Sequence, residues 1–284
     1  IVIVDDGSTD SSRTILEGYR HHPKIHIYLQ QNSGSSAAIN RGITLAKGSY
    51  ISILNSDDRY ASSRIEQLLA IAQTHVEPCL LATGVQLIDE QGALLPEDFW
   101  WNRMYVDMLM RWQAAAPHSE ARSSILSWGN LTASTSNFFF HKDLIELYGG
   151  FRKYRYVQDW EFLLRVTQGG LERFVFLPEK KLLQYRIHGK NTILSGVEKN
   201  HIEALYVLQK HLNLRYPEAK LTHLRLKYLG NYLRKYGNYQ REKHFNELQL
   251  SFEHTQNLVA GQATHIEKLE ASYKDLVTHL EEER

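Results

Sequence analysis

The sequence has little cysteine, almost no net charge and no long apolar run. Its single cysteine, Cys79, excludes an intrachain disulfide, suits a reducing compartment and has apolar neighbours that predict a buried thiol. Lys and Arg number 33 against 32 Asp and Glu, so no nucleic-acid partner is predicted. No apolar stretch approaches the roughly 20 residues of a membrane span. We therefore expect a cytoplasmic protein, with attachment to the inner face of the membrane left open.

The chain also lacks an initiator methionine and opens directly on an apolar run, residues 1–4, so we expect a fragment whose N-terminus is missing. No Gly-x-Gly-x-x-Gly follows that run, which disfavours a nicotinamide-dependent oxidoreductase. With 284 residues and 43% hydrophobic content, the sequence is sufficient for one large domain, or for a domain with an extension.

A predicted buried strand, residues 50–54, ends in a polar stretch that includes the adjacent carboxylates Asp57 and Asp58. Ligands of open α/β sheets bind just beyond the carboxyl ends of the strands. Two carboxylates there need a counter-charge, and a hard divalent cation with oxygen ligands is the simplest one. A helix cap at Asp58 or Ser62 explains the same residues, so this stretch alone leaves both interpretations open.

A second acidic pair, Asp5 and Asp6, follows the apolar run at the start of the chain. Between the two pairs, residues 11–46 predict a helix, a strand and a helix. The order β-α-β-α-β implies parallel strands with right-handed crossovers, so both pairs are expected to face one crevice. Their recurrence favours a nucleotide site over two unrelated helix caps.

Three later features each have two interpretations. The aromatic stretch 97–128 predicts an amphipathic helix packed on the sheet or, equally, a mobile lid or acceptor platform. Asp159 begins a predicted helix, either as a functional carboxylate or as a charge favoured by the helix dipole. Glu161 is expected to point elsewhere on that helix and to tolerate Gln. His188 follows a predicted strand, 182–187, as a ligand or as a structural histidine.

Short motifs in a constant order connect these features over residues 1–195. They are the segments 4–10, 32–34, 38–42, 48–51, 55–58, 149–151, 158–159 and 185–188. By these motifs the sequence resembles the family 2 inverting glycosyltransferases of the GT-A fold. The resemblance implies an α/β, Rossmann-like fold: a mostly parallel sheet with helices on both faces, plus a C-terminal helical extension. The strand and helix with which the family normally begins have no counterpart here.

The resemblance also implies roles for individual residues. Donor binding is assigned to Asp5, Asp6, Ser8, Asn32, Gly34, Asn55 and Ser56. Asp6, with Asp5, would hold the base of a nucleoside diphosphate. Asp57, the last residue of the Asp-x-Asp motif, would bind Mn²⁺ or Mg²⁺, with His188 as a further metal ligand. Asp159 would be the catalytic base. The chain departs from the family pattern at Asn55, where the family has Asp, and at Ile39 and Gln158.

The implied activity is transfer of a hexosyl or N-acetylhexosaminyl group from a nucleotide sugar, with a UDP-sugar favoured, to a glycan or lipid-linked acceptor. Cell-surface polysaccharide or glycoconjugate synthesis is the expected context. The alternative is a catalytically inactive sugar-nucleotide-binding module on an oligomerising coiled-coil protein, for which Asn55 is the main argument. Because Asp57 and Asp159 are both present, activity is favoured.

Three regions are predicted along the chain. Residues 1–195 form the GT-A domain, 196–240 form a helical region packed against it, and 241–284 form a coiled-coil helix. The last prediction rests on apolar residues at alternating three- and four-residue steps, which is an a/d seam. This helix would join an oligomer or a partner protein. A helix folded back on the domain remains the other interpretation.

Overall fold

The computed structural model describes residues 1–117, 119–189, 191 and 197–215. All of them belong to one compact unit, Ile1–Tyr232, whereas the predicted coiled coil at 241–284 lies outside the described residues. The strands are β1 (Val2–Asp5), β2 (His26–Leu29), β3 (Tyr50–Ser52), β4 (Arg59–Tyr60), β5 (Leu80–Ile88), β6 (Phe139–His141) and β7 (Phe174–Arg186). The helices are α1 (Ser12–Glu17), α2 (Ser35–Leu45), α3 (Arg64–Ala72), α4 (Trp100–Ala114), α5 (Glu120–Trp128), the 3₁₀ turn η1 (Thr135–Asn137), α6 (Asp143–Tyr148), α7 (Gln158–Val166) and α9 (Val197–Arg215).

The described strands form two sheets. β1 and β2 make a parallel pair, and the other strands form a sheet of order β3-β6-β5-β7-β4. The predicted order β-α-β-α-β over the first 54 residues is present. However, β3 pairs antiparallel with β6 and not with β1 or β2, so the described strands do not place the two acidic pairs at the edge of one continuous sheet. The α/β class is confirmed, with strand directions more mixed than expected.

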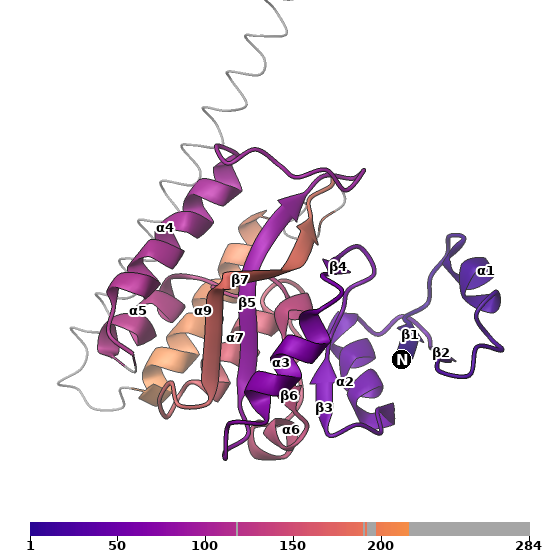
Figure 1. The fold of residues 1–284 in the computed structure, drawn as a ribbon, viewed down its shortest axis with the longest axis horizontal. Helices are drawn as coiled ribbons and strands as arrows, with labels where there is room; N and C mark the ends of the chain where they lie inside the picture. The colour runs from indigo at the N-terminus through magenta and orange to yellow at the C-terminus, as the bar shows by residue number, and fades with distance from the viewer. Residues whose placement is uncertain (118, 190, 192–196, 216–284) are drawn as a thin grey trace, which may run out of the picture. The chain divides into compact units, whose positions relative to one another are not determined.

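β5 lies at the centre of the larger sheet, beside β7 (Figure 1). Its apolar sequence is buried on both faces except at Gln86, as expected for an inner strand. β5 runs parallel to β7, and the register shifts on both sides of Gly84. A Cβ atom at Gly84 would lie 2.2 Å from the carbonyl oxygen of Pro178, so only glycine allows the two backbones to approach this closely.

The aromatic stretch forms helices, and one face of α4 is part of the core. Trp101, Tyr105, Met108 and Trp112 recur at helical spacing and are all buried. This packing supports the interpretation of an amphipathic helix. Within the ranges that the structure describes, no helix combines the length and apolar character needed to cross a bilayer.

The helix α9 also contributes to the core. Ala204, Val207, Leu208 and Leu212 are buried in the main hydrophobic cluster, and α9 contacts α7. Glu203 on the same helix accepts hydrogen bonds from the backbone amides of Arg155 and Tyr156, just before α7 begins. The described part of the predicted helical region therefore packs on the domain and supports the N-terminal end of α7.

Candidate active site

The carboxylate of Asp57 faces the imidazole of His188. Asp57 follows β3, and His188 follows β7, so the two residues meet although 131 positions separate them. The Oδ2 atom of Asp57 lies 3.1 Å from Nε2 of His188, and their side chains are 34% and 21% exposed. The backbone is fixed as well, because Arg186 Nε donates to the carbonyl oxygen of Asp57 at 2.8 Å. This pair is open enough to accept a ligand.

Asp58 points inward and joins two segments. Its carboxylate accepts hydrogen bonds from Ser136 Oγ at 2.6 Å, from Ser134 Oγ at 3.4 Å and from the Arg186 amide at 3.0 Å. Burial raises the pKa of Asp58 to about 6, despite these hydrogen bonds. The sequence left Asp58 as a helix cap or a ligand, whereas the structure makes it the link between the Asp57 turn and β7.

Asn55 is held by the turn η1. Its amide nitrogen Nδ2 donates to Ser134 Oγ at 3.1 Å, and its Oδ1 accepts from Thr135 Oγ1 at 3.2 Å. The backbone N–H of Asn55 donates to Ser136 Oγ at 2.9 Å. An aspartate here could not donate the first of these bonds, so the asparagine fits its surroundings in this protein.

A buried polar layer supports that turn. Asn137 donates from Nδ2 to the carbonyl of Thr83 at 2.7 Å and accepts from the Thr83 amide at 3.0 Å. Arg64, which has no exposed surface, donates to Thr83 Oγ1 at 2.8 Å and to the Asn137 carbonyl at 2.9 Å. Its guanidinium also lies 4.7 Å from the ring centre of Tyr60, and burial lowers its pKa. The turn η1, which forms hydrogen bonds with Asn55 and Asp58, is thus fixed to β5 through Asn137 and Thr83.

Asp159 lies in the first turn of α7 and is almost fully buried. Its Oδ2 accepts from Asn130 Nδ2 at 2.8 Å, and its Oδ1 accepts from the Trp160 amide at 2.7 Å. Burial raises the pKa of Asp159 to about 6, although these hydrogen bonds act in the opposite direction. A carboxylate with a raised pKa in a polar, buried position is typical of a general base.

Tyr185 lies on β7 directly before Arg186, the residue that donates hydrogen bonds to Asp57 and Asp58. Burial raises the pKa of Tyr185, and the charges on Asp58, Asp159 and Asp57 raise it further. The indole of Trp101 on α4 lies 6.0 Å from the Tyr185 ring, between ring centres. α4 thus reaches the site through its buried face.

A separate group of predicted residues surrounds Asp6 at the end of β1. Asp6 Oδ1 accepts from Gln30 Nε2 at 2.6 Å and from the Ser33 amide at 2.8 Å, and Oδ2 accepts from the Gly34 amide at 2.8 Å. Gly34, with φ of 91°, directly precedes α2. These bonds fix the loop before α2, so part of the hydrogen-bonding capacity of the Asp6 carboxylate is used within the protein.

Asp5, Ser8 and Asn32 complete this group. Asp5 is buried and forms an ion pair of 3.0 Å with Arg13. The Ser8 amide also donates a hydrogen bond to Asp5. The hydrogen bond with Ser8 lowers the pKa of Asp5 most, and Arg13 lowers it further. Gly7 has φ of 79°, and a Cβ atom there would lie 2.8 Å from the Asn32 amide nitrogen. This glycine is needed for the close approach of the two loops.

The loop before α7 is joined to α2. Gln158 Nε2 donates to Ser35 Oγ at 3.3 Å, and Ser36 Oγ donates to the Tyr154 carbonyl at 3.4 Å. Because α2 begins beside Gly34 and α7 begins beside Asp159, these contacts bring the Asp6 group next to the first turn of α7. They link the residues around Asp6 to the helix that carries Asp159.

The sequence matches a known family. Residues 1–146 match the model of Glycosyl transferase family 2, which is half of the chain. The chain belongs to glycosyltransferase family 2. Among relatives of this family 2 chain, an uncharacterized glycosyltransferase of Methanocaldococcus jannaschii is 24% identical over 217 residues, which is 74% of this chain and 68% of that protein.

Two further relatives of this family 2 chain are named for polysaccharides. The teichuronic acid biosynthesis glycosyltransferase TuaG of Bacillus subtilis, so named without proof of activity, is 28% identical over 151 residues, 46% of this chain and 59% of TuaG. Chondroitin synthase of Escherichia coli is 26% identical over 230 residues, 79% of this chain and 30% of the synthase.

The solved structures confirm the GT-A fold of the family 2 chain. TarS of S. aureus, residues 1–349 in complex with UDP-GlcNAc, is 18% identical, with a TM-score of 0.58 over 82% of this chain and 62% of that one. The chain therefore spans less than two thirds of this neighbour, and the likeness concerns the fold.

The structure brings together some of the residues that the sequence assigned to the candidate site. Sequence reasoning placed Asp57 with His188, which the structure brings together, and Asp159 at a helix start. Ser56, also predicted for donor binding, is exposed beside Asp57. Sequence reasoning did not single out Tyr185 and Asn130, because single polar residues in strands and loops have no periodic signature. It also missed the serines of η1, for which the only signal was the run of small polar residues at 132–137.

Proposed function

We propose that the protein is a metal-dependent inverting glycosyltransferase that moves a hexosyl or N-acetylhexosaminyl group from a UDP-sugar to a hydroxyl acceptor. The observations that support this best are that Asp57 faces His188, and that the segment 130–136 bonds to Asp58 through Ser134 and Ser136 and to Asp159 through Asn130. One site then contains a ligand pair for a cation and a buried carboxylate able to take a proton.

Asp159 acts as the base in this proposal. The acceptor hydroxyl gives its proton to Asp159 while its oxygen forms a bond to the anomeric carbon. The bond from that carbon to the diphosphate breaks, and its electron pair leaves with the nucleoside diphosphate. One base opposite the leaving group gives inversion in a single displacement. With a pKa of about 6, Asp159 is ionised at neutral pH and is a stronger base than an ordinary carboxylate.

A divalent cation fits the pair formed by Asp57 and His188. Their facing atoms are 3.1 Å apart, and no cluster of three or more acidic, histidine or cysteine ligands occurs among the described residues. Mg²⁺ in such sites is held by one or two carboxylates together with substrate phosphates, and Mn²⁺ accepts the same oxygen ligands, so Asp57 would be the main ligand and His188 an additional nitrogen ligand. Bound there, Mn²⁺ or Mg²⁺ would stabilise the negative charge of the departing diphosphate.

The named relatives support the choice of substrates. The TarS structure contains UDP-GlcNAc, and TuaG and chondroitin synthase are named for polysaccharide synthesis. We extend this to a UDP-sugar donor here, with a glycan or lipid-linked acceptor and a role in polysaccharide or glycoconjugate synthesis in the cytoplasm. The base would lie near Asp6, Asn32 and Gly34, the ribose near Asn55 and Ser56.

The second candidate is an inactive sugar-nucleotide-binding module, which Asn55 favours because it removes one negative charge from the Asp-x-Asp motif. The hydrogen bonds of Asn55 argue against this alternative, because Ser134 and Thr135 are arranged to pair with both atoms of the asparagine amide. The charges that the chemistry requires, on Asp57 and Asp159, are both retained.

The test is UDP release from a panel of UDP-sugars with Mn²⁺, Mg²⁺ or chelator. We expect cation-dependent release that falls at least about a hundredfold in Asp159→Asn, the low end for a general base, with UDP affinity unchanged. Asp143→Asn, an exposed carboxylate at the start of α6, is the matched control. UDP binding without turnover in any condition would favour the inactive module. Full activity in Asp159→Asn would remove Asp159 from the mechanism.

A further inference from the structure

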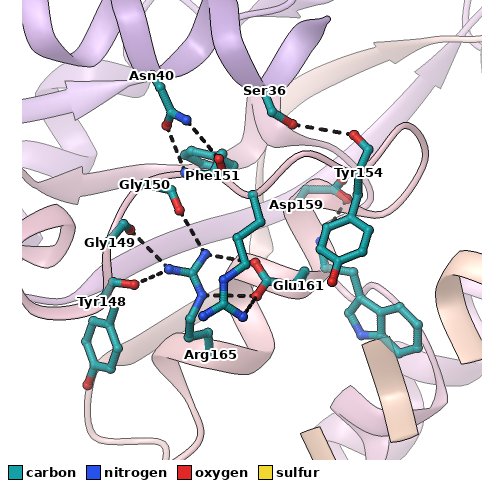
Figure 2. A network of polar contacts seen from close by, with 12 residues as sticks. Ser36, Asn40, Tyr148, Gly149, Gly150, Phe151, Tyr154, Asp159, Glu161 and Arg165 are labelled. Carbon is teal, nitrogen blue, oxygen red and sulfur yellow. Dashed lines mark hydrogen bonds and ion pairs between the residues drawn. The ribbon is translucent and has the colours of Figure 1, made fainter. Parts of the chain in front are cut away.

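A buried ion-pair cluster lies on α7 and begins two residues beyond Asp159, at Glu161 (Figure 2). Glu161 and Arg165 are four residues apart and pair through Oε2 and Nη2 at 2.8 Å and through Oε1 and Nε at 3.1 Å. Their side chains are only 6% and 10% exposed. Arg152, from the loop before α7, adds a contact of 2.7 Å to Glu161 Oε1. The sequence predicts that Glu161 tolerates Gln, whereas these ion pairs favour the opposite expectation.

Arg165 also holds the end of α6. It donates to the carbonyl oxygens of Tyr148, Gly149 at 3.2 Å and Gly150 at 3.0 Å. These carbonyls follow the last turn of α6, where backbone acceptors have no partner in the helix and a cation is favoured. Figure 2 shows the guanidinium between this loop and Glu161. One side chain thus joins α6, the loop and α7.

The same loop is fixed from the other side by Asn40 of α2. Asn40 accepts from the Phe151 amide and donates to the Phe151 carbonyl, both at 2.8 Å. A Cβ atom at Gly150 would lie 2.5 Å from Asn40 Oδ1, so the loop is in close contact with α2. The ring of Phe151 stacks on Phe162 of α7, with centres 4.5 Å apart. A continuous set of contacts therefore runs from α2 to α7.

We propose that Arg165 and Glu161 are positioning residues, which hold α7 against the loop at 148–152 and so set the direction in which α7 presents Asp159. The proposal rests on the proposed role of Asp159 as base. Residues two apart on a helix point to nearly opposite sides, so Glu161 acts through the helix and not on the substrate. We call Arg165 and Glu161 the clamp. A reacting group misplaced by about 1 Å can lose a hundredfold in rate, so loosening the clamp should slow the reaction.

The variants are Arg165→Lys and Glu161→Gln, with Arg173→Lys as the control. Lysine keeps the charge but cannot serve Glu161 and the loop carbonyls together, because it lacks the planar fork of donors. Arg173 makes the same kinds of contact, to the Pro78 carbonyl at 3.1 Å and to Glu77 at 2.8 Å, at the start of β7. UDP release from the best donor of the panel is measured per folded, UDP-binding molecule.

We expect kcat to fall roughly ten- to hundredfold in Arg165→Lys and Glu161→Gln, with UDP affinity within twofold, and no change in Arg173→Lys. A second readout needs no turnover: the pKa of Asp159, followed by carboxyl NMR. It should fall toward the ordinary value, because a loosened α7 admits water. The groups recorded around Asp159 are the neutral Asn130, the Trp160 amide and Tyr185, whose raised pKa keeps it neutral.

Two results overturn the proposal. One is a kcat and an Asp159 pKa that match those of Arg173→Lys. The other is a loss of kcat that disappears once rates are corrected for the folded fraction, which shows a role in stability alone. Asp159→Asn separates the two hypotheses: if it remains fully active, the role of Asp159 as base fails, whereas if it is inactive and the clamp variants are normal, only the clamp fails.

Discussion

Replacing Asp159 by Asn should stabilise the protein more at alkaline than at acidic pH. Burial raises the pKa of Asp159 to about 6, against 3.8 for an ordinary aspartate. At about 1.4 kcal/mol per pKa unit, ionising this side chain in the folded state costs roughly 3 kcal/mol. The folded state prefers the protonated form, so this contribution to stability is present below the unfolded pKa and is lost as the pH rises through about 6.

The hydrogen bonds of the site oppose part of that gain. Thr132 donates its amide and its hydroxyl to Asn130 Oδ1, at 3.1 and 2.6 Å, so the Asn130 Nδ2 donor faces residue 159. A new amide at 159 must turn its own donor toward either Asn130 or the Trp160 amide. That conflict costs about 1–3 kcal/mol and does not depend on pH. The net effect at pH 8 is thus about zero to 2 kcal/mol of stabilisation.

The pH dependence is the sharper quantity, because the constant cost cancels. The stability difference between Asp159→Asn and the wild type should shift in favour of the variant by roughly 1.5 kcal/mol from pH 5 to pH 8. Urea denaturation of both proteins at these pH values measures it, with Asp143→Asn as the exposed control. Parallel stability curves for the wild type and Asp159→Asn would refute the raised pKa.

Three further predictions follow from the same structure and sequence. Asp57→Ala should abolish Mn²⁺-dependent UDP binding measured by calorimetry while the melting temperature stays within a few degrees, because the side chain lies outside the core; unchanged affinity would remove Asp57 from the metal site. Asn137→Ala should lower the free energy of unfolding by about 3 kcal/mol or more, because it leaves the Thr83 amide and carbonyl without partners, and a loss below about 1 kcal/mol in urea would contradict this account. Deleting residues 245–280 should reduce the number of protomers per particle, measured by light scattering, without loss of UDP binding, if the heptad pattern forms a coiled coil. An unchanged number of protomers would favour the folded-back helix.

Much of the fold followed from local patterns. The strand predicted at 50–54 is present as β3, Tyr50–Ser52, and the aromatic stretch 97–128 contains the helix α4, whose buried face begins at Trp101. These signals are strong because burial repeats with the period of the element. The pairing of β3 with β6 was not predicted, since which strands pair depends on contacts far apart in the sequence.

The candidate site residues that the sequence singled out are those whose chemistry is concentrated in single side chains. Asp57, His188 and Asp159 stood out as charged groups at the ends of elements. The buried turn η1 did not, because serine and threonine are also common in exposed loops. Glu161 was placed on the correct helix but expected to tolerate neutralisation, because an ion pair with Arg165 and Arg152 cannot be distinguished from surface charge without the fold.

The loop between α6 and α7 is held chiefly through its backbone. Asn40 binds the amide and carbonyl of Phe151, and Glu203 binds the amides of Arg155 and Tyr156, so these bonds would survive a change of side chain. Lys153 and Arg155 are exposed on this loop, directly before the helix of the proposed base. Mutation of these exposed side chains can therefore change the surface of the loop while the backbone bonds that hold it stay in place. Under the proposed function, such changes would alter the acceptor preference with little effect on the stability of the fold.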